Sequence, residues 1–194
     1  MFNGIIHHTG TFEGRRKNEF IFSMKKSKKN ILRKGMSVSV NGACLTIRKV
    51  LPKNCFMVDI MPQTLKMTNL NVLKKHNLVN IELPLLRKDI LSGYIVQGHV
   101  DGNAKIIQKI HRENSVRLTM RFPTPLFRFL IDKGSVTING VLLTITQLHK
   151  NCGSVFLTPY TVEKTNLGLL QKGDTVNIEI DIIAKYLYKF LNKK

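Results

Sequence analysis

Short runs of alternating polar and apolar residues, separated by turn residues, recur along the whole chain. Residues 37–40 alternate in this way and lead directly into Asn41-Gly42. Asn-Gly after such a run is the strongest short signal for a β-hairpin, because a type I′ turn needs positive φ at both positions. Asn139-Gly140 repeats the device after residues 135–138, and CFMVDI, SVRLTM and SVFLTP read as further short strands. The pattern predicts a chain built mainly of strands.

The chain carries this design twice. SVSVNGACLTI (37–47) matches SVTINGVLLTI (135–145), MPQTLKMTNL (61–70) matches TPYTVEKTNL (158–167), and VNIEL (79–83) matches VNIEI (176–180). FNGII at 2–6 loosely matches VQGHV at 96–100. Four landmarks in one order, at offsets of 98, 97, 97 and 94 residues, indicate a duplicated domain of about half the chain. Turns every ten residues or so predict a small barrel or sandwich in each half.

Helices are expected between the hairpins and at the C-terminus. Thr124-Pro125 suits a helix start and Lys133-Gly134 a helix end. In IIAKYLYKFLNKK one helical stripe is apolar, and Asp181 precedes it as a cap; the stripe comprises Ile183, Tyr186, Leu187, Phe190 and Leu191. This stripe either covers the chain's own barrels or packs against other copies of the chain. Its short polar face argues against a membrane-surface helix.

Composition narrows the class of protein. The chain has 194 residues, 43% of them hydrophobic, which suffices for one or two domains with real cores. No run of 18 apolar residues occurs, so no membrane-spanning helix is expected. The N-terminal MFNGIIHHTG does not read as a signal peptide, and a cytoplasmic protein is expected. Three cysteines without C-x-x-C spacing argue against a disulfide framework or a zinc site.

The net charge of +19 raises the alternative of a nucleic-acid-binding module. Basic clusters lie at residues 15–17, 25–26, 28–29 and 74–75. They carry few aromatic residues, which single-strand binders usually interleave with charge. No zinc-finger, helix-turn-helix or RNP pattern is present. The interpretation we favour is a solvated, lysine-rich surface.

Together the motifs resemble the riboflavin synthase family. The resemblance rests on MFNGII, SVSVNGACLTI, MPQTLKMTNL, GYIVQGHVDG and VNIEIDIIAKYL and covers essentially the whole chain. It implies an all-β fold of two tandem six-stranded Greek-key barrels followed by an amphipathic α-helix. The domains expected are an N-terminal lumazine-binding barrel at 1–94, a C-terminal one at 95–182 and a trimerisation helix at 183–194. The boundary between the halves is expected near residues 91–93.

The resemblance also implies a reaction. Two molecules of 6,7-dimethyl-8-ribityllumazine exchange a four-carbon unit and yield riboflavin and 5-amino-6-ribitylaminouracil, without a metal or organic cofactor. A homotrimer is implied, with the active site formed where the N-barrel of one chain faces the C-barrel of a neighbour. Association with lumazine synthase is a further implied partnership. A reaction that consumes two identical molecules gives a reason for writing the sequence twice.

Carried over motif by motif, the resemblance implies two sets of site residues. Cys44, His99, Thr46 and Asp181 are the candidates for catalysis. The implied substrate-binding residues of the N-barrel are Gly4, Ile5, Ile6, Cys44, Leu45, Thr46, Gln63, Thr64, Leu65, Lys66, Met67, Thr68, Gly98, His99 and Val100. Those of the C-barrel are Lys133, Leu142, Leu143, Thr144, Tyr160, Thr161, Val162, Glu163, Lys164 and Thr165, with Asp181 beside them.

Each candidate also has a plainer interpretation. Cys44 is either a nucleophile or a small pocket wall. His99 either moves protons near neutral pH or is an ordinary strand histidine. Thr46 and Thr144 either donate hydrogen bonds to the ring or are simply good strand residues. Lys133 could be no more than a charge at a helix C-terminus.

The sequence departs from the family pattern mainly in its second half. Leu142 stands where the family commonly has Ser, Asn139 where it has an acid, and Gln63 where Glu is frequent. Leucine can neither donate a hydrogen bond nor activate water. Two hypotheses follow: an enzyme that still turns over, which we favour, or a non-catalytic lumazine or flavin carrier.

Overall fold

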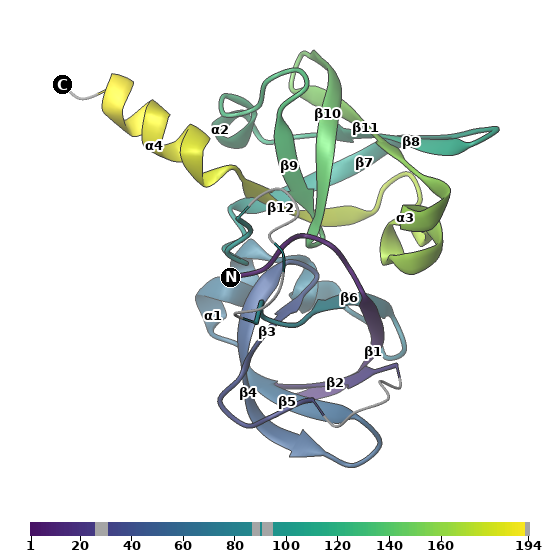
Figure 1. The fold of residues 1–194 in the computed structure, drawn as a ribbon, viewed down its shortest axis with the longest axis vertical. Helices are drawn as coiled ribbons and strands as arrows, with labels where there is room; N and C mark the ends of the chain where they lie inside the picture. The colour runs from purple at the N-terminus through teal and green to yellow at the C-terminus, as the bar shows by residue number, and fades with distance from the viewer. Residues whose placement is uncertain (26–30, 87–89, 91–94, 193–194) are drawn as a thin grey trace.

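Each half of the repeat closes into a six-stranded antiparallel barrel (Figure 1). The computed structural model describes residues 1–25, 31–86, 90 and 95–192. The first barrel has the spatial order β1-β2-β5-β4-β3-β6. Its strands are β1 (His8–Arg16), β2 (Glu19–Met24), β3 (Ser37–Val40), β4 (Ala43–Leu51), β5 (Cys55–Asp59) and β6 (Leu78–Glu82).

The second barrel repeats the first. Its spatial order is β10-β11-β8-β7-β12-β9. Its strands are β7 (Gly102–Arg112), β8 (Ser115–Arg121), β9 (Ser135–Ile138), β10 (Val141–His149), β11 (Cys152–Leu157) and β12 (Thr175–Ile180). The predicted all-β fold of two six-stranded barrels is confirmed. The boundary expected near residues 91–93 lies outside the described residues, so the domain limits stay a prediction.

The Asn-Gly pairs turn the hairpins as expected. Asn41 and Gly42 have φ of 46° and 81° between β3 and β4, and Asn139 and Gly140 have the same values between β9 and β10. Both pairs therefore adopt the double positive-φ turn that fits the strand twist. Along the strands, alternate side chains enter each barrel. The first core is rich in phenylalanine, including Phe20, Phe22 and Phe56, whereas aliphatic residues dominate the second.

The helical segments between the strands are short. They are α1 (Pro62–Met67), η1 (Asn69–Val72), α2 (Thr124–Phe127), α3 (Pro159–Lys164) and η2 (Asn166–Leu169). The prediction that one helix extends from Thr124 to Lys133 was too long. Helix α2 ends at Phe127, its N-cap position is Pro123, and the Thr124 side chain does not cap it. Lys133 lies beyond it in a left-handed turn with φ of 63°, because its amide pairs with the Ile145 carbonyl in the barrel.

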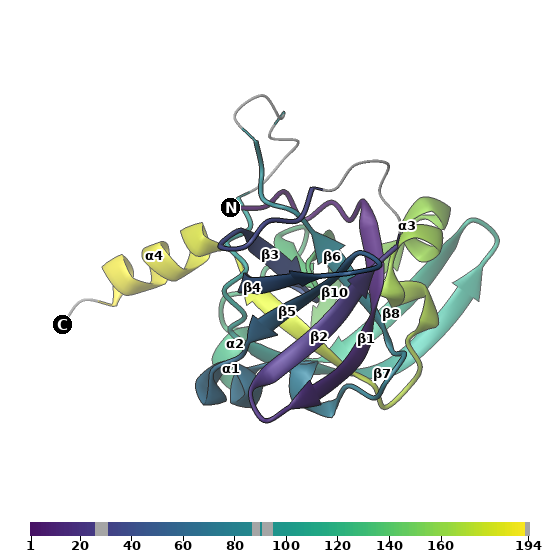
Figure 2. The same cartoon turned by 90° about the horizontal axis from the view of Figure 1, so that it is seen from below.

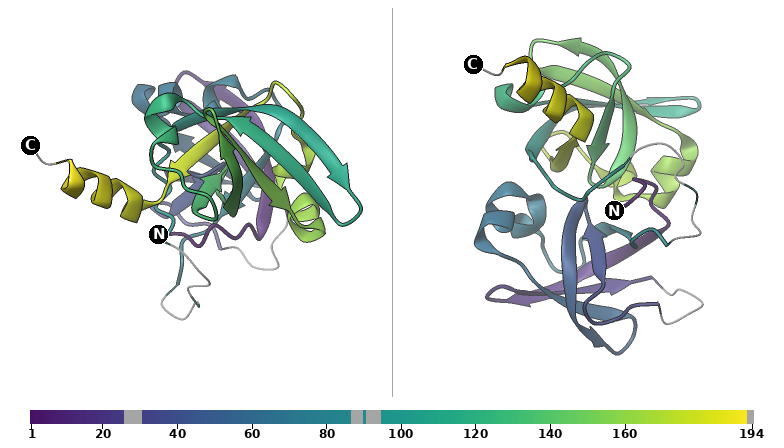
Figure 3. Two further views of the ribbon diagram at one scale, coloured as in Figure 1. Left: turned by 90° about the horizontal axis from the view of Figure 1, so that it is seen from above. Right: turned by 60° about the vertical axis from the view of Figure 1, so that its left-hand side comes forward.

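Helix α4 (Ile182–Leu191) follows the last strand and extends to one side of the molecule (Figures 2 and 3). Its Tyr188 ring packs edge-on against Phe129, and Ala184 contacts the second core. The predicted cap is confirmed, since Asp181 Oδ1 accepts a hydrogen bond from the Ile183 amide at 2.7 Å. The apolar stripe is 55–83% exposed in the single chain. Of the two alternatives left open by the sequence, the one in which the stripe covers the chain's own barrels is therefore wrong. What packs on it stays a prediction.

Six buried asparagines join the two barrels. Asn69 of η1 donates its amide to Asn177 Oδ1 of β12 at 2.6 Å, and the repeat-related Asn166 amide donates to Asn80 Oδ1 at 2.7 Å. The side-chain amide of Asn177 reaches the carbonyl of Asn41 at 2.8 Å. Buried amides are tolerated only when they are hydrogen-bonded, and here each barrel bonds the other. The network fixes the two barrels against one another.

Candidate functional site

The first candidate pocket is built around Cys44 on β4. Its amide donates to the carbonyl of Gly98 at 2.8 Å, so the segment that precedes the second barrel lies along the first one. Gly98 has φ of +78°, and a Cβ added there would come within 2.6 Å of the Cys44 Cβ. Cys44 is half-buried, and His99, which follows Gly98, is exposed. The structure thus brings together two of the predicted catalytic residues.

The repeat-related pocket is built around Leu142 on β10. Its amide donates to the carbonyl of Gly4 at 2.9 Å, and a Cβ added to Gly4 would come within 2.6 Å of the Leu142 Cβ. Ile6 is part of the core of the second barrel. The assignment of Gly4, Ile5 and Ile6 to the N-barrel site was therefore wrong. The reason is topological: the N-terminal segment runs along the second barrel before the chain enters the first.

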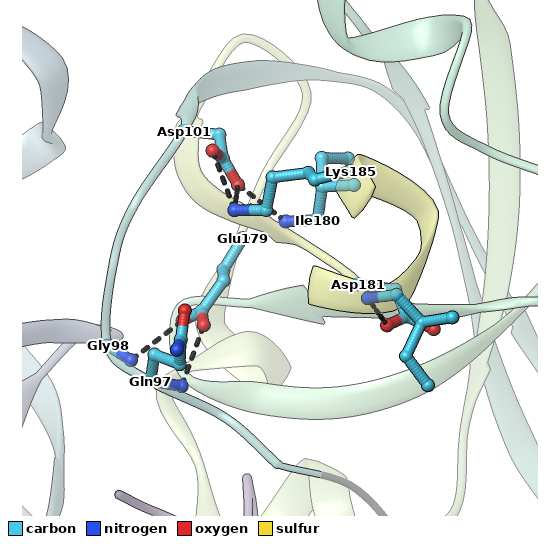
Figure 4. A network of polar contacts seen from close by, with 8 residues as sticks. Gln97, Gly98, Asp101, Glu179, Ile180, Asp181 and Lys185 are labelled. Atoms are coloured by element: carbon cyan, nitrogen blue, oxygen red, sulfur yellow. Dashed lines mark hydrogen bonds and ion pairs between the residues drawn. The ribbon is translucent and has the colours of Figure 1, made fainter. Parts of the chain in front are cut away.

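The two crossing segments run side by side and are held by carboxylates. Phe2 and Val96 pair their backbones through hydrogen bonds of 2.8 and 3.1 Å. Glu179, at the end of β12, accepts hydrogen bonds from the amides of Gln97 at 2.7 Å and Gly98 at 2.9 Å (Figure 4). Glu82, at the end of β6, accepts from the amides of Asn3 at 2.6 Å and Gly4 at 3.2 Å. Each barrel therefore anchors the segment that lines the other barrel's pocket.

Burial raises the pKa of both carboxylates. Burial raises the pKa of Glu82 to about 7, partly opposed by the amide hydrogen bonds of Asn3 and Gly4. Burial likewise raises the pKa of Glu179, opposed by the amides of Gln97 and Gly98 and by the charge of Lys185. Both side chains thus combine burial with dense hydrogen bonding to the backbone. They hold structure rather than face an open pocket.

The other predicted binding residues lie on the segments around these two strands. In the first half, Leu65 on α1 and Val100 both pack against the first core, while Thr68 is buried and its hydroxyl bonds the Thr64 carbonyl at 2.7 Å. Thr165 repeats this bond to the carbonyl of Thr161 in the second half. The remaining positions include exposed side chains (Thr46, Gln63, Lys66, Thr144, Tyr160, Glu163 and Lys164) and partly or fully buried ones (Leu45, Met67, Leu143 and Val162).

Two residues of the predicted set lie at junctions between elements rather than within the central strands. Asp181 occupies the junction of β12 and α4, where one of its oxygens caps the helix. Lys133 is exposed in the turn before β9. Asn139, one of the departures from the family pattern, belongs to the asparagine network between the barrels. Its Oδ1 accepts a hydrogen bond from the amide of Asn177 at 2.8 Å. The presence of asparagine instead of the family's acid at this position therefore affects the barrel interface more directly than the chemistry.

A cavity of about 320 Å³ lies between the barrels, but apart from the predicted site. Its floor is formed by the interface asparagines and its walls by aliphatic residues such as Leu73 and Leu170. None of the predicted binding residues lines it. Among the residues described here, no cluster of histidine, cysteine or acidic side chains could hold a metal ion. No helix in the described ranges is long and apolar enough to cross a membrane.

Sequence reasoning missed the two carboxylates that anchor the crossing segments, Glu82 and Glu179, and two asparagines of the barrel interface, Asn80 and Asn177. The signal was present, because all four lie in the repeated VNIE motif at 79–82 and 176–179. An acid and an amide that recur at buried positions of a strand indicate a specific hydrogen-bonding role. We used the motif only as a landmark of the repeat.

Comparison with known proteins gives this architecture a class. Residues 3–84 and 97–181 each match the family described as the lumazine binding domain. The solved structure of LumP complexed with riboflavin superimposes with a TM-score of 0.84 and covers 93% of this chain and 99% of its own, at 24% identity. LumP complexed with 6,7-dimethyl-8-(1'-D-ribityl) lumazine gives a TM-score of 0.81. At that identity the likeness supports the fold alone. The chain consists of two lumazine-binding domains.

Sequence relatives narrow the class further. The riboflavin synthase of Bacillus subtilis (strain 168) is 39% identical over 196 residues, which cover 100% of this chain and 91% of the relative. That of Actinobacillus pleuropneumoniae is 36% identical over 197 residues, with the same coverage. The riboflavin synthase of Photobacterium leiognathi is 32% identical over 195 residues. The chain belongs to the riboflavin synthase family. The prediction of an enzyme of the transferase class is confirmed.

Proposed function

We propose that this protein catalyses the dismutation of two 6,7-dimethyl-8-ribityllumazine molecules to riboflavin and 5-amino-6-ribitylaminouracil. The observation that carries the proposal is the doubled arrangement of a barrel strand and the segment that crosses it. Cys44 and Leu142 occupy the same place in two related barrels, and each is lined by the segment that the other barrel anchors. Two copies of one binding domain suit a reaction whose two substrates are the same molecule. The family relatives support this assignment.

The chemistry needs few groups. The C7 methyl of one lumazine must lose a proton, which a base or a positioned water can accept. A nucleophile can add to the second lumazine, and the four-carbon unit then passes from one ring to the other within a site that keeps both in contact. We assign Cys44, His99 and Thr46 to the first pocket, where Cys44 and His99 flank Gly98. Asp181 is assigned to the second barrel's side, at the root of α4.

We further propose that the active protein is a homotrimer. The exposed apolar stripe of α4 supports this proposal, because Ile183, Tyr186 and Leu187 are each more than half exposed in one chain. Apolar patches of this kind are typical of interaction surfaces. In the trimer, the first pocket of one chain faces the second pocket of its neighbour. Such an arrangement holds the two lumazines together and makes activity depend on assembly.

The direct test is to mix purified protein with 6,7-dimethyl-8-ribityllumazine and to follow riboflavin fluorescence. Growth of the signal, with riboflavin reaching half of the lumazine consumed, is the expected result. That ratio is specific to dismutation, because one molecule donates the four carbons that the other receives. Binding of the lumazine without any growth would reject the enzyme in favour of a carrier. Steeply salt-dependent binding of a random oligonucleotide, with neither binding nor turnover of lumazine, would favour the nucleic-acid alternative.

A further inference from the structure

Helix α4 is attached to the first barrel's pocket segment, although it follows the last strand of the second barrel. Lys185 Nζ donates to both carboxylate oxygens of Asp101, at 2.9 and 2.8 Å. Asp101 lies three residues after Gly98, and its Oδ2 also accepts from the amide of Ile180 at 2.8 Å (Figure 4). Both ionic side chains are only about a quarter exposed, at 23% and 25%. The pair is thus less screened by solvent than a surface ion pair.

Residues next to this ion pair in the sequence hold the pocket wall. Glu179 accepts the amides of Gln97 and Gly98, and the Gly98 carbonyl accepts the amide of Cys44. The charge of Lys185 lowers the pKa of Glu179, whereas that of Asp101 raises it. The ammonium group therefore favours the ionised carboxylate, which is the stronger hydrogen-bond acceptor for the two amides. Helix α4 is thus connected to Asp101, Asp101 to the Ile180 amide, and the neighbouring Glu179 to the amides of Gln97 and Gly98. The Gly98 carbonyl completes the route to Cys44.

We propose that Asp101 and Lys185 are a positioning pair that ties helix α4 to the Gly98–His99 wall of the first pocket. The inference rests on the proposed function only in taking that pocket as the ligand site. Neither residue touches the pocket itself; each acts through the backbone between Gln97 and Asp101. Since the opposite, apolar face of α4 is the surface offered to other copies of the chain, the pair makes the first pocket sensitive to whatever α4 packs against.

The repeat gives an internal contrast. The N-terminal segment that lines the second pocket is held by Glu82 in the same way, through the amides of Asn3 and Gly4. Within the described residues, no helix equivalent to α4 follows β6, and the next element along the chain is β7. Loss of the pair is therefore expected to disturb the pocket of Cys44 and to leave that of Leu142 intact.

The reactivity of the Cys44 thiol can be used to measure how this wall is held. In a Cys55→Ser, Cys152→Ser background it is the single thiol of the chain, and its rate of reaction with an aromatic disulfide reagent measures how firmly Gly98 covers it. Riboflavin added as a probe should slow that reaction by occupying the pocket. Lys185→Met should raise the labelling rate about fivefold and weaken riboflavin protection about fivefold, which corresponds to roughly 1 kcal/mol.

Two control variants distinguish an effect of the Asp101–Lys185 pair from a general effect of changing helix α4. Lys189→Met removes a charge from an exposed position one helical turn away and should behave as the background protein. Lys185→Arg keeps the charge and can donate to both carboxylate oxygens of Asp101. Its Cys44 labelling rate should therefore stay close to that of the background protein. All variants should melt within a few degrees of the parent, since only a local contact is lost.

The outcomes are distinct. Equal labelling of the Lys185→Met variant and the background would overturn the inference. So would a rise of the same size in Lys189→Met, because the effect would then belong to helix α4 as a whole. If riboflavin fails to protect Cys44 even in the background protein, the assignment of the pocket fails, while the labelling rate alone still decides whether the pair holds the wall.

Discussion

Gly4 and Leu142 are bonded through their backbones although 138 positions of the sequence separate them: the Leu142 amide donates to the Gly4 carbonyl at 2.9 Å. Gly4 has φ of +71°, and its missing side chain leaves room for the Leu142 Cβ. The N-terminal segment can therefore lie flat against the second barrel only with glycine at this position. This contact places residues from the start of the chain against a strand of the second barrel.

Gly4→Ala should destabilise the protein by more than a left-handed backbone alone costs. A Cβ at Gly4 would lie 2.6 Å from Leu142 Cβ, so overpacking of about 1–3 kcal/mol adds to a conformational cost of about 1 kcal/mol. Gly173→Ala is the matched control, because its φ is +99° but its Cβ would meet nothing within 4 Å. Urea unfolding of both variants measures the difference. Equal losses would show that the N-terminal segment can shift without cost.

The protonation of Glu82 makes stability depend on pH. Its pKa is raised from 4.5 to about 7 in the folded protein, so the folded state binds the proton more tightly than the unfolded chain. The stability from this group is fully present below pH 4.5 and is lost as the pH rises through 7. Relative to the Glu82→Gln variant, the wild type should lose on the order of 3 kcal/mol over that range.

Urea unfolding at a series of pH values gives this difference. Glu113→Gln, which removes an exposed carboxylate from the turn between β7 and β8, should leave the wild-type profile unchanged. The prediction fails if Glu82→Gln runs parallel to the wild type at every pH. The same measurement on Glu179→Gln is expected to show the same sign, because burial is again the main cause of the raised pKa.

Local signals carried most of the fold. The Asn41-Gly42 and Asn139-Gly140 turns and the cap at Asp181 are decided by residues close together in sequence, and each is present in the structure. The duplication was visible as repeated motifs about 97 residues apart, and it corresponds to the two barrels. The length of helix α2 was overestimated because Lys133, taken as its last residue, belongs to a separate turn whose amide bonds the Ile145 carbonyl of the barrel.

The candidate site was predictable in its residues but not in its grouping. Cys44 and Leu142 were found as repeat equivalents, and in the structure each is closely approached by a glycine of a crossing segment. That Gly4 lies against the second barrel could not be read from spacing, whereas Gly98 had been assigned to the first barrel through the resemblance. The reason is that this crossing depends on which strand each segment meets after the barrels close. The anchoring carboxylates Glu82 and Glu179 fix that choice.

Cys44→Ala should reduce turnover more than it reduces ligand binding, if the thiol takes part in the chemistry. The side chain is half-buried beside Gly98, so its removal takes away little contact area. Steady-state rates with 6,7-dimethyl-8-ribityllumazine, together with the affinity for riboflavin, separate the two effects. Equal losses in rate and affinity would make Cys44 a wall of the pocket and no more. Cys55→Ser is the control, since Cys55 lies on β5.

Leu187→Glu should prevent assembly through α4. Leu187 is 55% exposed in the single chain and belongs to the apolar stripe, so a charge there would have to be buried in any helix–helix contact. Lys189→Glu is the control, because Lys189 lies outside the stripe and is exposed. Sedimentation should give a smaller particle for Leu187→Glu alone, with lower activity. A variant that is monomeric and fully active would contradict the shared active site.

Leu142→Ser tests whether the second pocket keeps the chemistry that the family's serine would supply. The resemblance implies a serine here, and Leu142 is half-buried with its Cβ against Gly4. If the pocket keeps the family's chemistry, a hydroxyl at this place should raise turnover or leave it unchanged, because it restores a hydrogen-bond donor beside the substrate. The cost in stability should stay below that of a core truncation, roughly 2–5 kcal/mol, since the side chain is not fully buried. Initial rates and urea unfolding on the same preparation distinguish the two effects. A large fall in rate at unchanged stability would mean that the leucine itself contacts the substrate, and that this chain binds its second lumazine through apolar contact rather than through a hydroxyl.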